Sequence, residues 1–458
     1  MKSVGLALLA ALASCVPSRS SVFHPVDREI ERRLGVEATW GDERVPAAIA
    51  ELLAKPLDRD AVVRIALAKN RRLQAQYDQL GIAASEVAGA TVLAPMEVDL
   101  QYKVAADGHS ELEIDAIQDI LDLIQLPQRR GAARADLEAA RARAVAATVE
   151  LVANVERSYV DMVAAQQELE LWQTAFDAAS ASAEIAERMH AAGNAPDLAL
   201  ARERDRREQT RIELARAQLD VEQAREAINA VLGLSGKDTN WSVTNRLPDV
   251  PDAAPALDSI ERDAVVASLH LAAIRSEAEA AAGRLGVARV RAWLPELGVG
   301  VAVARGEGEW SAGPAVSLGL PIFNQQQGPR ARATAELRRS RNEASATATE
   351  LRAQARATRQ RVLATYAEAR HLREVVLPLR QQILDETLKQ YNAMNASTFD
   401  LLTARRELVD GGRQYIDALR RFWRASAEIR ALVRGAMPRG GGDERAPTSA
   451  GASRQEGH

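Results

Sequence analysis

The spacing of apolar residues changes repeatedly along the chain, and each change predicts a different element. Over residues 57–90 apolar residues recur every three or four positions, which predicts an amphipathic helix. Residues 97–104 (EVDLQYKV) alternate strictly between polar and apolar, and the alternation resumes over residues 111–116. Period two predicts a strand pair within about residues 95–126, with one apolar and one wet face. A helical pattern then runs without a break over residues 128–192.

The same order of elements is written twice. A break at 193–197 and a returning helix over about 198–232 complete a first long hairpin. A proline-rich linker at 247–256 follows, and the order then repeats with an offset of about 200 residues. The second copy consists of a helix over about 257–290, strands within about 293–321, a long helix over about 328–394, a break at 395–398 and a return helix ending near Val433. We therefore predict two repeats, at 57–246 and 257–434.

The two ends of the chain have a different character from the repeats. Residues 1–14 have the charged start and short apolar run of a signal peptide, and Leu12-Ala13-Ser14-Cys15 resembles a bacterial lipobox. Cleavage before Cys15 and acylation of its sulfur would follow, the alternative being an unmodified free cysteine. Residues 15–56 contain several prolines and read as an irregular leader. The polar, Gly-rich and Ser-rich residues 435–458 predict a disordered tail.

Composition and charge narrow the class of protein. The chain has 458 residues, of which 47% are hydrophobic but only 4% aromatic, a composition that favours long helices over an aromatic globular core. Its 59 basic and 63 acidic residues are interleaved, so we expect no nucleic-acid partner. The sequence contains no catalytic motif, no metal-ligand spacing of His or Cys and no cofactor fingerprint. We expect neither an enzyme nor a metal site.

The apolar face of the predicted strands must be covered by lipid, by other subunits or by the helices. No segment has the roughly 18 consecutive apolar residues of a membrane helix, so any span must use strands. Four amphipathic strands cannot close a barrel alone, because about eight are needed. Either other subunits complete a barrel, or the strands are two soluble hairpins packed on the helices.

Over residues 57–434 the chain resembles the TolC-like outer membrane efflux protein family. The residues that carry the resemblance are Cys15 in its lipobox, the strand exits QLP (125–127) and GLPIFN (319–324), Arg134 and Arg330 opening the long helices, and the helix breaks GNAPDLAL (193–200) and NASTFDLL (395–402). The first junction lacks the aromatic residue that Phe323 supplies in the second, and Asn395 replaces Gly193. Asn also tolerates a left-handed backbone.

The resemblance implies a mainly α fold with a membrane β-hairpin pair per protomer. Three copies would form a twelve-stranded β-barrel in the outer membrane, and their long antiparallel coiled-coil hairpins would form a periplasmic α-barrel. The homotrimer would conduct substrates passively, with an inner-membrane transporter supplying the energy and a periplasmic adaptor (membrane fusion protein) docking at the tips. The protein would thus be lipid-anchored, in contact with outer membrane lipid and extending into the periplasm.

Two groups of site residues follow from this resemblance. The strand-to-helix junctions contain Pro127, Arg134, Pro321, Phe323 and Arg330. The periplasmic aperture and adaptor-docking surface would comprise Gly193, Asp197, Leu198, Leu200, Asn395, Ser397, Asp400, Leu401 and Leu402. Asp197 and Asp400 could form acidic rings in a trimer, or each could simply cap its returning helix.

The sequence also allows a second class of function, that of a scaffold protein. A lipid-anchored periplasmic coiled-coil scaffold would explain the long helices and the lipobox but not the matched strand pairs. The cargo could be metal ions, drugs or polypeptides. Residues 118–130 resemble the metal-efflux branch of the family overall, and this resemblance favours metal ions as the cargo.

Overall fold

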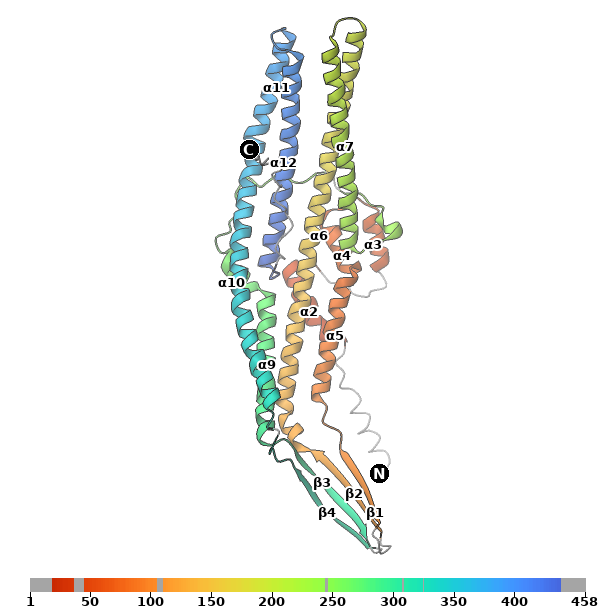
Figure 1. Ribbon diagram of the computed structural model, residues 1–458, viewed down its shortest axis with the longest axis vertical. Helices are drawn as coiled ribbons and strands as arrows, with labels where there is room; N and C mark the ends of the chain where they lie inside the picture. Colours follow the sequence, from red (N-terminus) through yellow and green to blue (C-terminus); the bar gives the residue numbers. More distant parts are fainter. Residues whose placement is uncertain are drawn as a thin grey trace, which may run out of the picture.

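The computed structural model describes residues 19–36, 45–104, 110–243, 246–306, 309–323 and 325–437. These residues form a long, narrow molecule with strands at one end and the tips of two helical hairpins at the other (Figure 1). The elements are α2 (Arg19–Leu34), α3 (Val45–Leu53), α4 (Arg59–Lys69), α5 (Arg71–Thr91), β1 (Glu97–Val104), β2 (Ser110–Asp119), α6 (Ile120–Ala191), α7 (Asp197–Leu232), η2 (Gly236–Thr239), α8 (Ile260–Ala267), α9 (Leu269–Trp293), β3 (Leu297–Gly306), β4 (Glu309–Leu318), α10 (Gln327–His371), η3 (Leu372–Val376), α11 (Leu377–Asn392) and α12 (Thr398–Val433).

The four strands form one antiparallel sheet in the order β1-β2-β3-β4. Its central pair joins the two repeats, because β2 of the first pairs with β3 of the second, with Ile114 opposite Val303. The helices attached to the strands lie in the same order, α5 beside α6, α6 beside α9 and α9 beside α10. The sheet extends past these helices, and all eight residues of β1 are exposed. The alternative of hairpins packed on their own helices is therefore wrong for β1.

The helix that precedes each strand pair is interrupted at a capping residue. The side chain of Asn70 accepts a hydrogen bond from the Leu73 N–H at 3.0 Å, and the Ser268 hydroxyl accepts one from the Leu271 N–H at 3.2 Å. Asn and Ser favour helix starts because they satisfy a first-turn N–H. The predicted continuous helices over 57–90 and 257–290 are thus each two helices, broken at equivalent places.

The predicted irregular leader contains two helices. In α2, Val22, Val26 and Ile30 recur every four residues and are almost completely buried, because this face packs against α6. Pro25 also lies inside this helix. Cys15 and residues 1–14 lie outside the described residues.

The start of the predicted disordered tail, residues 435–458, is ordered. The first residues assigned to the disordered tail are packed, since the Gly435 carbonyl accepts a hydrogen bond from the Leu269 N–H at 3.0 Å and Ala436 is buried. Residues 438–458 lie outside the described part of the chain.

The two long helices differ in regularity. In α6, Val152, Val155 and Met162 recur at the spacings of a coiled-coil face, and all three are buried. The second long helix is continuous but contains a π-helical turn, η3, where the Leu377 N–H bonds to the Leu372 carbonyl. Pro378 follows directly and has no N–H to continue the α-helical pattern. None of the described helices is long and apolar enough to cross a bilayer.

Candidate functional site: strand wall, junctions and helix tips

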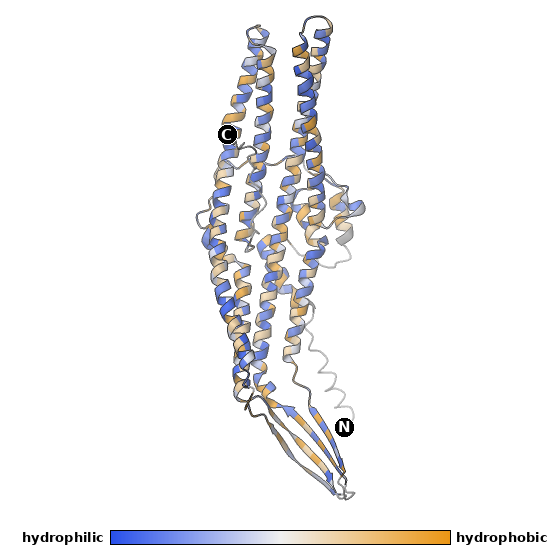
Figure 2. Ribbon diagram, in the orientation of Figure 1, coloured by the Kyte–Doolittle hydropathy of each residue, from blue (hydrophilic) through white to orange (hydrophobic). Residues whose placement is uncertain are grey.

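One face of the sheet is largely apolar, with Ser110, Gln118 and Arg305 as its polar residues. Partners in an antiparallel register point to the same side, and Leu100, Ile114 and Val303 form one such row. The β1 residues on this face are 64–66% exposed. The face contains Val98, Leu100, Tyr102 and Val104 of β1, Leu112, Ile114 and Ala116 of β2, Val299, Val301 and Val303 of β3, and Ala312, Pro314, Val316 and Leu318 of β4. Figure 2 shows the resulting alternation of hydropathy along the strands.

The opposite face of the sheet is polar or small except at Ile117. On β1 and β2 it consists mainly of carboxylates: Glu97, Asp99, Glu111, Glu113, Asp115 and Asp119, with Lys103 bound to Glu113 at 3.0 Å. On β3 and β4 it consists of Gly298, Gly300, Ala302, Ala304, Ser311, Gly313, Ala315 and Ser317. This division between an apolar wall and a wet wall matches the alternation that lipid and water impose on a membrane strand.

Two aromatic residues lie in one row near the end of the sheet farthest from the helices. Tyr102 is opposite Leu112, which is opposite Arg305, which is opposite Trp310. The Arg305 guanidinium carbon lies 5.4 Å from the centroid of the Trp310 ring. Aromatic residues at the edge of an apolar band are typical of the membrane–water boundary.

The first strand-to-helix junction lies earlier than predicted. β2 ends at Asp119, and α6 begins at Ile120 because the Asp119 carboxylate accepts hydrogen bonds from the N–H groups of Leu121 and Asp122 at 2.8 and 3.3 Å. Pro127, which was expected to close the strand region, instead lies inside α6. Arg134 is also well within the helix rather than at its start.

A buried carboxylate braces this first junction. Asp122 is only 6% exposed, and it accepts hydrogen bonds from Arg129 at 2.9 Å and from Arg291 of α9 at 2.5 Å. Arg129 lies seven residues further along α6, so their bond spans the segment that contains Pro127. The amide oxygen of Gln125 accepts from Arg291 at 3.2 Å. Sequence analysis missed this cluster, although the seven-residue spacing of Asp122 and Arg129 places them on one helix face.

The second junction uses a loop rather than an immediate helix start. β4 ends at Leu318, and α10 begins at Gln327 after Gln326, whose φ is +55°. Pro321 lies in this loop and Phe323 is 92% exposed. Arg330 lies in the first turn of α10, as predicted. The first junction has no such loop, because α6 begins directly after β2.

The tip of the α6–α7 hairpin has a glycine in a left-handed conformation. Gly193 has a φ of +76°, and the Asn194 N–H bonds to the Met189 carbonyl at 2.8 Å, which closes the end of α6. Pro196 caps α7 without a side-chain hydrogen bond. Asp197 is almost fully exposed, with its Oδ1 3.4 Å from Nε2 of His190. Leu198 is exposed, whereas Leu200 is buried between helices.

The tip of the α11–α12 hairpin closes differently. The left-handed residue is Met394, with a φ of +58°, and not Asn395 as predicted. Ser397 and Asp400 form a capping box: the Asp400 N–H donates to the Ser397 hydroxyl at 3.2 Å, and the Asp400 carboxylate accepts from the Ser397 N–H at 2.9 Å. Hydrogen bonds from the Ser397 hydroxyl and N–H hold the pKa of Asp400 below its usual value. Asp400 therefore caps its helix, whereas Asp197 makes no capping bond.

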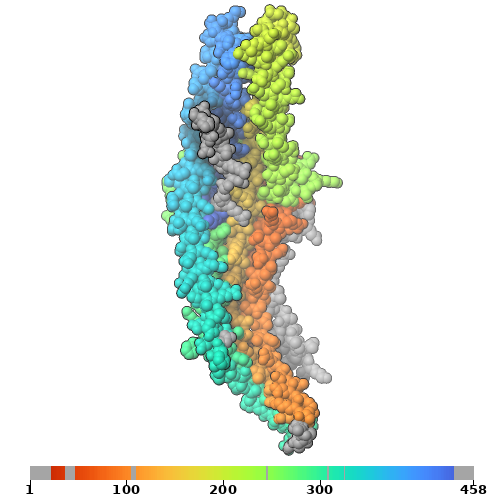
Figure 3. All heavy atoms as spheres, viewed as in Figure 1, coloured from red at the N-terminus to blue at the C-terminus, as the bar shows by residue number. Residues whose placement is uncertain are grey.

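The two tips stand next to each other, as Figure 3 shows at the end opposite the strands. A groove of about 850 Å³ lies between α6, α7 and α12. Arg206 donates to the Leu402 carbonyl at 3.1 Å, and the Arg202 guanidinium carbon lies 5.8 Å from the centroid of the Phe399 ring. Leu401 is half-buried in α12. Among the described residues no cluster of three or more His, Cys, Asp or Glu could hold a metal ion.

Comparison with known proteins agrees with this geometry. Residues 112–234 match the model of the outer membrane efflux protein family. The chain is 24% identical over 404 residues to the cobalt-zinc-cadmium resistance protein CzcC of Cupriavidus metallidurans, a match that covers 87% of this chain and 94% of that protein. The resemblance to the TolC-like outer membrane efflux proteins is confirmed.

Solved structures support the efflux-channel fold over most of the chain. The CmeC outer membrane channel of Campylobacter jejuni superposes with a TM-score of 0.70 at 15% identity, covering 83% of this chain and 86% of that one. The outer membrane protein VceC of Vibrio cholerae gives a TM-score of 0.66 at 15% identity, covering 89% and 98%. The predicted fold class is confirmed, with the strand wall at one end of the efflux-channel fold and the hairpin tips at the other.

Proposed function

We propose that three copies of this chain form an outer-membrane channel that passively conducts substrates from the periplasm to the exterior within a tripartite efflux system. The observation that carries the proposal is the sheet, which projects beyond the helices with two open edges and one largely apolar face. Open edges demand partners, and four strands are too few to close a barrel. Three copies of a four-stranded sheet supply twelve strands.

The two faces of the sheet then have distinct environments. The apolar face contacts lipid, with Tyr102 and Trp310 at the boundary farthest from the helices. The carboxylate-rich face lines the lumen, where water solvates it and where it attracts cations. An acidic lumen and a metal-resistance relative both support metal ions as cargo. Acylation at Cys15 would add a lipid anchor to the same membrane.

The helices continue the tube away from the membrane. The hairpin tips form the periplasmic aperture and the surface on which a periplasmic adaptor docks, and an inner-membrane transporter supplies the energy. The groove between α6, α7 and α12 supports this assignment, because Arg202 and Phe399 offer a charged and an apolar contact side by side. Conduction needs no catalytic group.

The test of the proposal is electrical. The purified full chain should run as a trimer in detergent and produce discrete, cation-favouring currents in a planar bilayer. A monomer or dimer without conductance would instead support the periplasmic scaffold.

A double substitution tests the proposed role of Asp197 and Asp400 at the aperture. Asp197→Ala combined with Asp400→Ala should lower cation selectivity or change conductance, because the acidic rings are lost. Asp220→Ala, an exposed acid on α7 far from the tip, is the control and should leave both unchanged. Unchanged selectivity and conductance in the double variant would remove Asp197 and Asp400 from the aperture.

A further inference from the structure

The two outermost helices of the molecule carry unpaired charges of opposite sign. Because the helices follow the strand order, α5 lies at the β1 edge and α10 at the β4 edge. On α5, Asp78 and Glu86 are exposed, and neither makes an ion pair with another described residue. On α10, Arg330 and Arg338 are likewise exposed and without an ion-pair partner in the described part of the chain.

These charges share one spacing. Asp78, Ile82 and Glu86 are separated by four residues each, so they lie on one face of α5, and this face is opposite the buried Tyr77 and Leu80. Ile82 is 52% exposed and protrudes between the two carboxylates. The α5 edge therefore presents an apolar side chain flanked by two negative charges.

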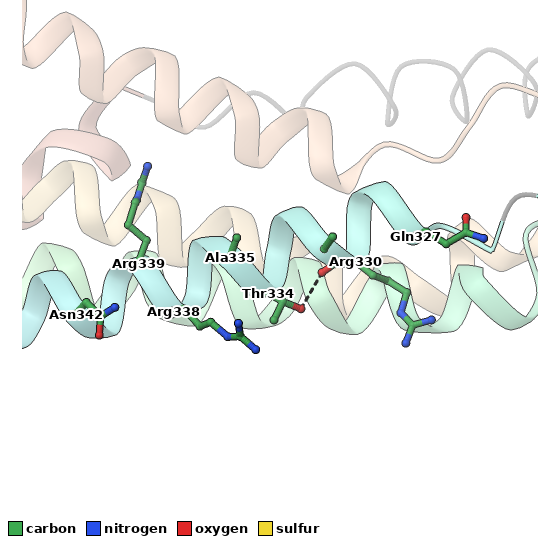
Figure 4. A pocket seen from close by; sticks show the side chains of 8 residues that line it. Gln327, Arg330, Thr334, Ala335, Arg338, Arg339 and Asn342 are labelled. Carbon is green, nitrogen blue, oxygen red and sulfur yellow. Dashed lines mark hydrogen bonds between the residues drawn. The ribbon is translucent and has the colours of Figure 1, made fainter.

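The α10 edge has a complementary shape. A shallow groove along this single helix is lined by Arg330, Ala331, Ala335 and Arg338, among others. Figure 4 shows Arg330 and Arg338 extending from one side of α10 and Arg339 from the other. Thr334 lies in line between the two arginines, and Ala331 and Ala335 beside it leave room for a protruding side chain. The two arginines lie eight residues apart, the same separation as Asp78 and Glu86.

The distances of the two sets from the strand-side ends of their helices also agree. At a rise of about 1.5 Å per residue, Glu86 and Arg330 lie roughly 8 and 5 Å from the strand-side ends of their helices. Asp78 and Arg338 lie roughly 20 and 17 Å from the same ends, and Ile82 and Ala335 roughly 14 and 12 Å. β1 runs away from the helices and β4 runs toward them, so a second copy can continue the antiparallel sheet with its α5 beside this copy's α10.

We infer that the α5 edge (Asp78, Ile82 and Glu86) of one copy docks on the α10 edge (Arg330, Ala331, Ala335 and Arg338) of the next, with Ile82 seated over Ala335 and each carboxylate paired with an arginine. This inference rests on the proposed trimer and specifies its register. Two charge pairs across the interface fix which edge meets which and reject a shifted alignment, because a shift places the apolar side chain against a charge.

A cysteine pair tests the register directly. Ile82→Cys with Ala335→Cys in the full chain should form disulfide-linked dimers and trimers on mild oxidation. The matched control is Ile82→Cys with Ala346→Cys, an exposed α10 residue roughly 16 Å further from the sheet than Ala335, which should not cross-link. Each single-cysteine variant reports any cross-link through Cys15. Equal cross-linking in both pairs, or none in the first, would overturn the inference.

A charge exchange tests the ion pairs. Asp78→Arg/Glu86→Arg should lose the trimer on size-exclusion chromatography with light scattering, and so should Arg330→Glu/Arg338→Glu. Combining all four substitutions should restore it. A wild-type chain that is not a trimer would overturn both this inference and the proposed function, whereas a wild-type trimer indifferent to the reversals would overturn the inference alone.

Discussion

The two halves of the chain build the same elements by different local means. In the first half the strand passes straight into α6 through the Asp119 cap, and the buried Asp122 braces the helix around Pro127. In the second half a loop separates β4 from α10, and a π-helical turn accommodates Pro378. The hairpin tips differ in the same way, with a glycine turn in one and a capping box in the other. Duplication thus preserves the path of the chain rather than the interactions that hold it.

The largest expected difference is in the stability that one buried side chain contributes to each of the two return helices, α7 and α12. Phe422 of α12 is 2% exposed, with its ring centroid 6.0 Å from that of Tyr366 and 5.1 Å from that of Trp423. Phe422→Ala should therefore lower the free energy of unfolding by about 3–5 kcal/mol. In α7 the buried Val221 occupies the corresponding place, and Val221→Ala should cost only about 2 kcal/mol. Thermal unfolding followed by circular dichroism compares them, and equal losses would contradict the difference in packing.

The first junction should be sensitive to loss of its buried carboxylate. Asp122→Ala leaves Arg129 and Arg291 without their shared partner, which should cost about 1–3 kcal/mol of stability. Asp136→Ala removes the more exposed partner of Arg284 and should cost less than about 1 kcal/mol. Urea titration of both variants in the same detergent gives the comparison. Similar midpoints for the two would show that Asp122 does not brace the junction.

The two tips should respond differently to loss of a cap. Ser397→Ala removes the hydroxyl of the capping box and should weaken the start of α12 by about 1 kcal/mol. Pro196→Ala removes no side-chain cap, so α7 should change much less. Hydrogen–deuterium exchange should accordingly quicken near residue 400 in the first variant only. Comparable acceleration at both tips would argue against the capping box.

The smallest effect should appear on acidification. The lowered pKa of Asp400 means that the folded tip holds its proton more weakly than the unfolded chain, so its stabilisation is complete above the ordinary value of 3.8 and is lost as the pH falls through the lower folded value. In limited digestion, pepsin should then cleave the α11–α12 tip more readily below pH 3.8 than at pH 3.8. The substitution Asp400→Asn should reduce this difference. A tip whose cleavage ignores pH would contradict it.

Periodicity alone predicted the strands, the long helices and their duplication, because burial on one face leaves a repeating pattern in the sequence. It failed where a single local interaction decides the outcome. The Asp119 cap starts α6 before Pro127, and Met394 rather than Asn395 takes the left-handed turn. The Asp122 cluster combines residues of α6 and α9 that are more than 150 positions apart, so no local pattern could assemble it.

The most direct test of the account is a single-particle structure of the full-length protein in lipid nanodiscs. We expect three copies around one axis, with their sheets closed edge to edge through β1 and β4 and a continuous lumen from the strands to the hairpin tips. A particle in which the sheet edges stay unpaired, or in which no lumen runs along the helices, would contradict it.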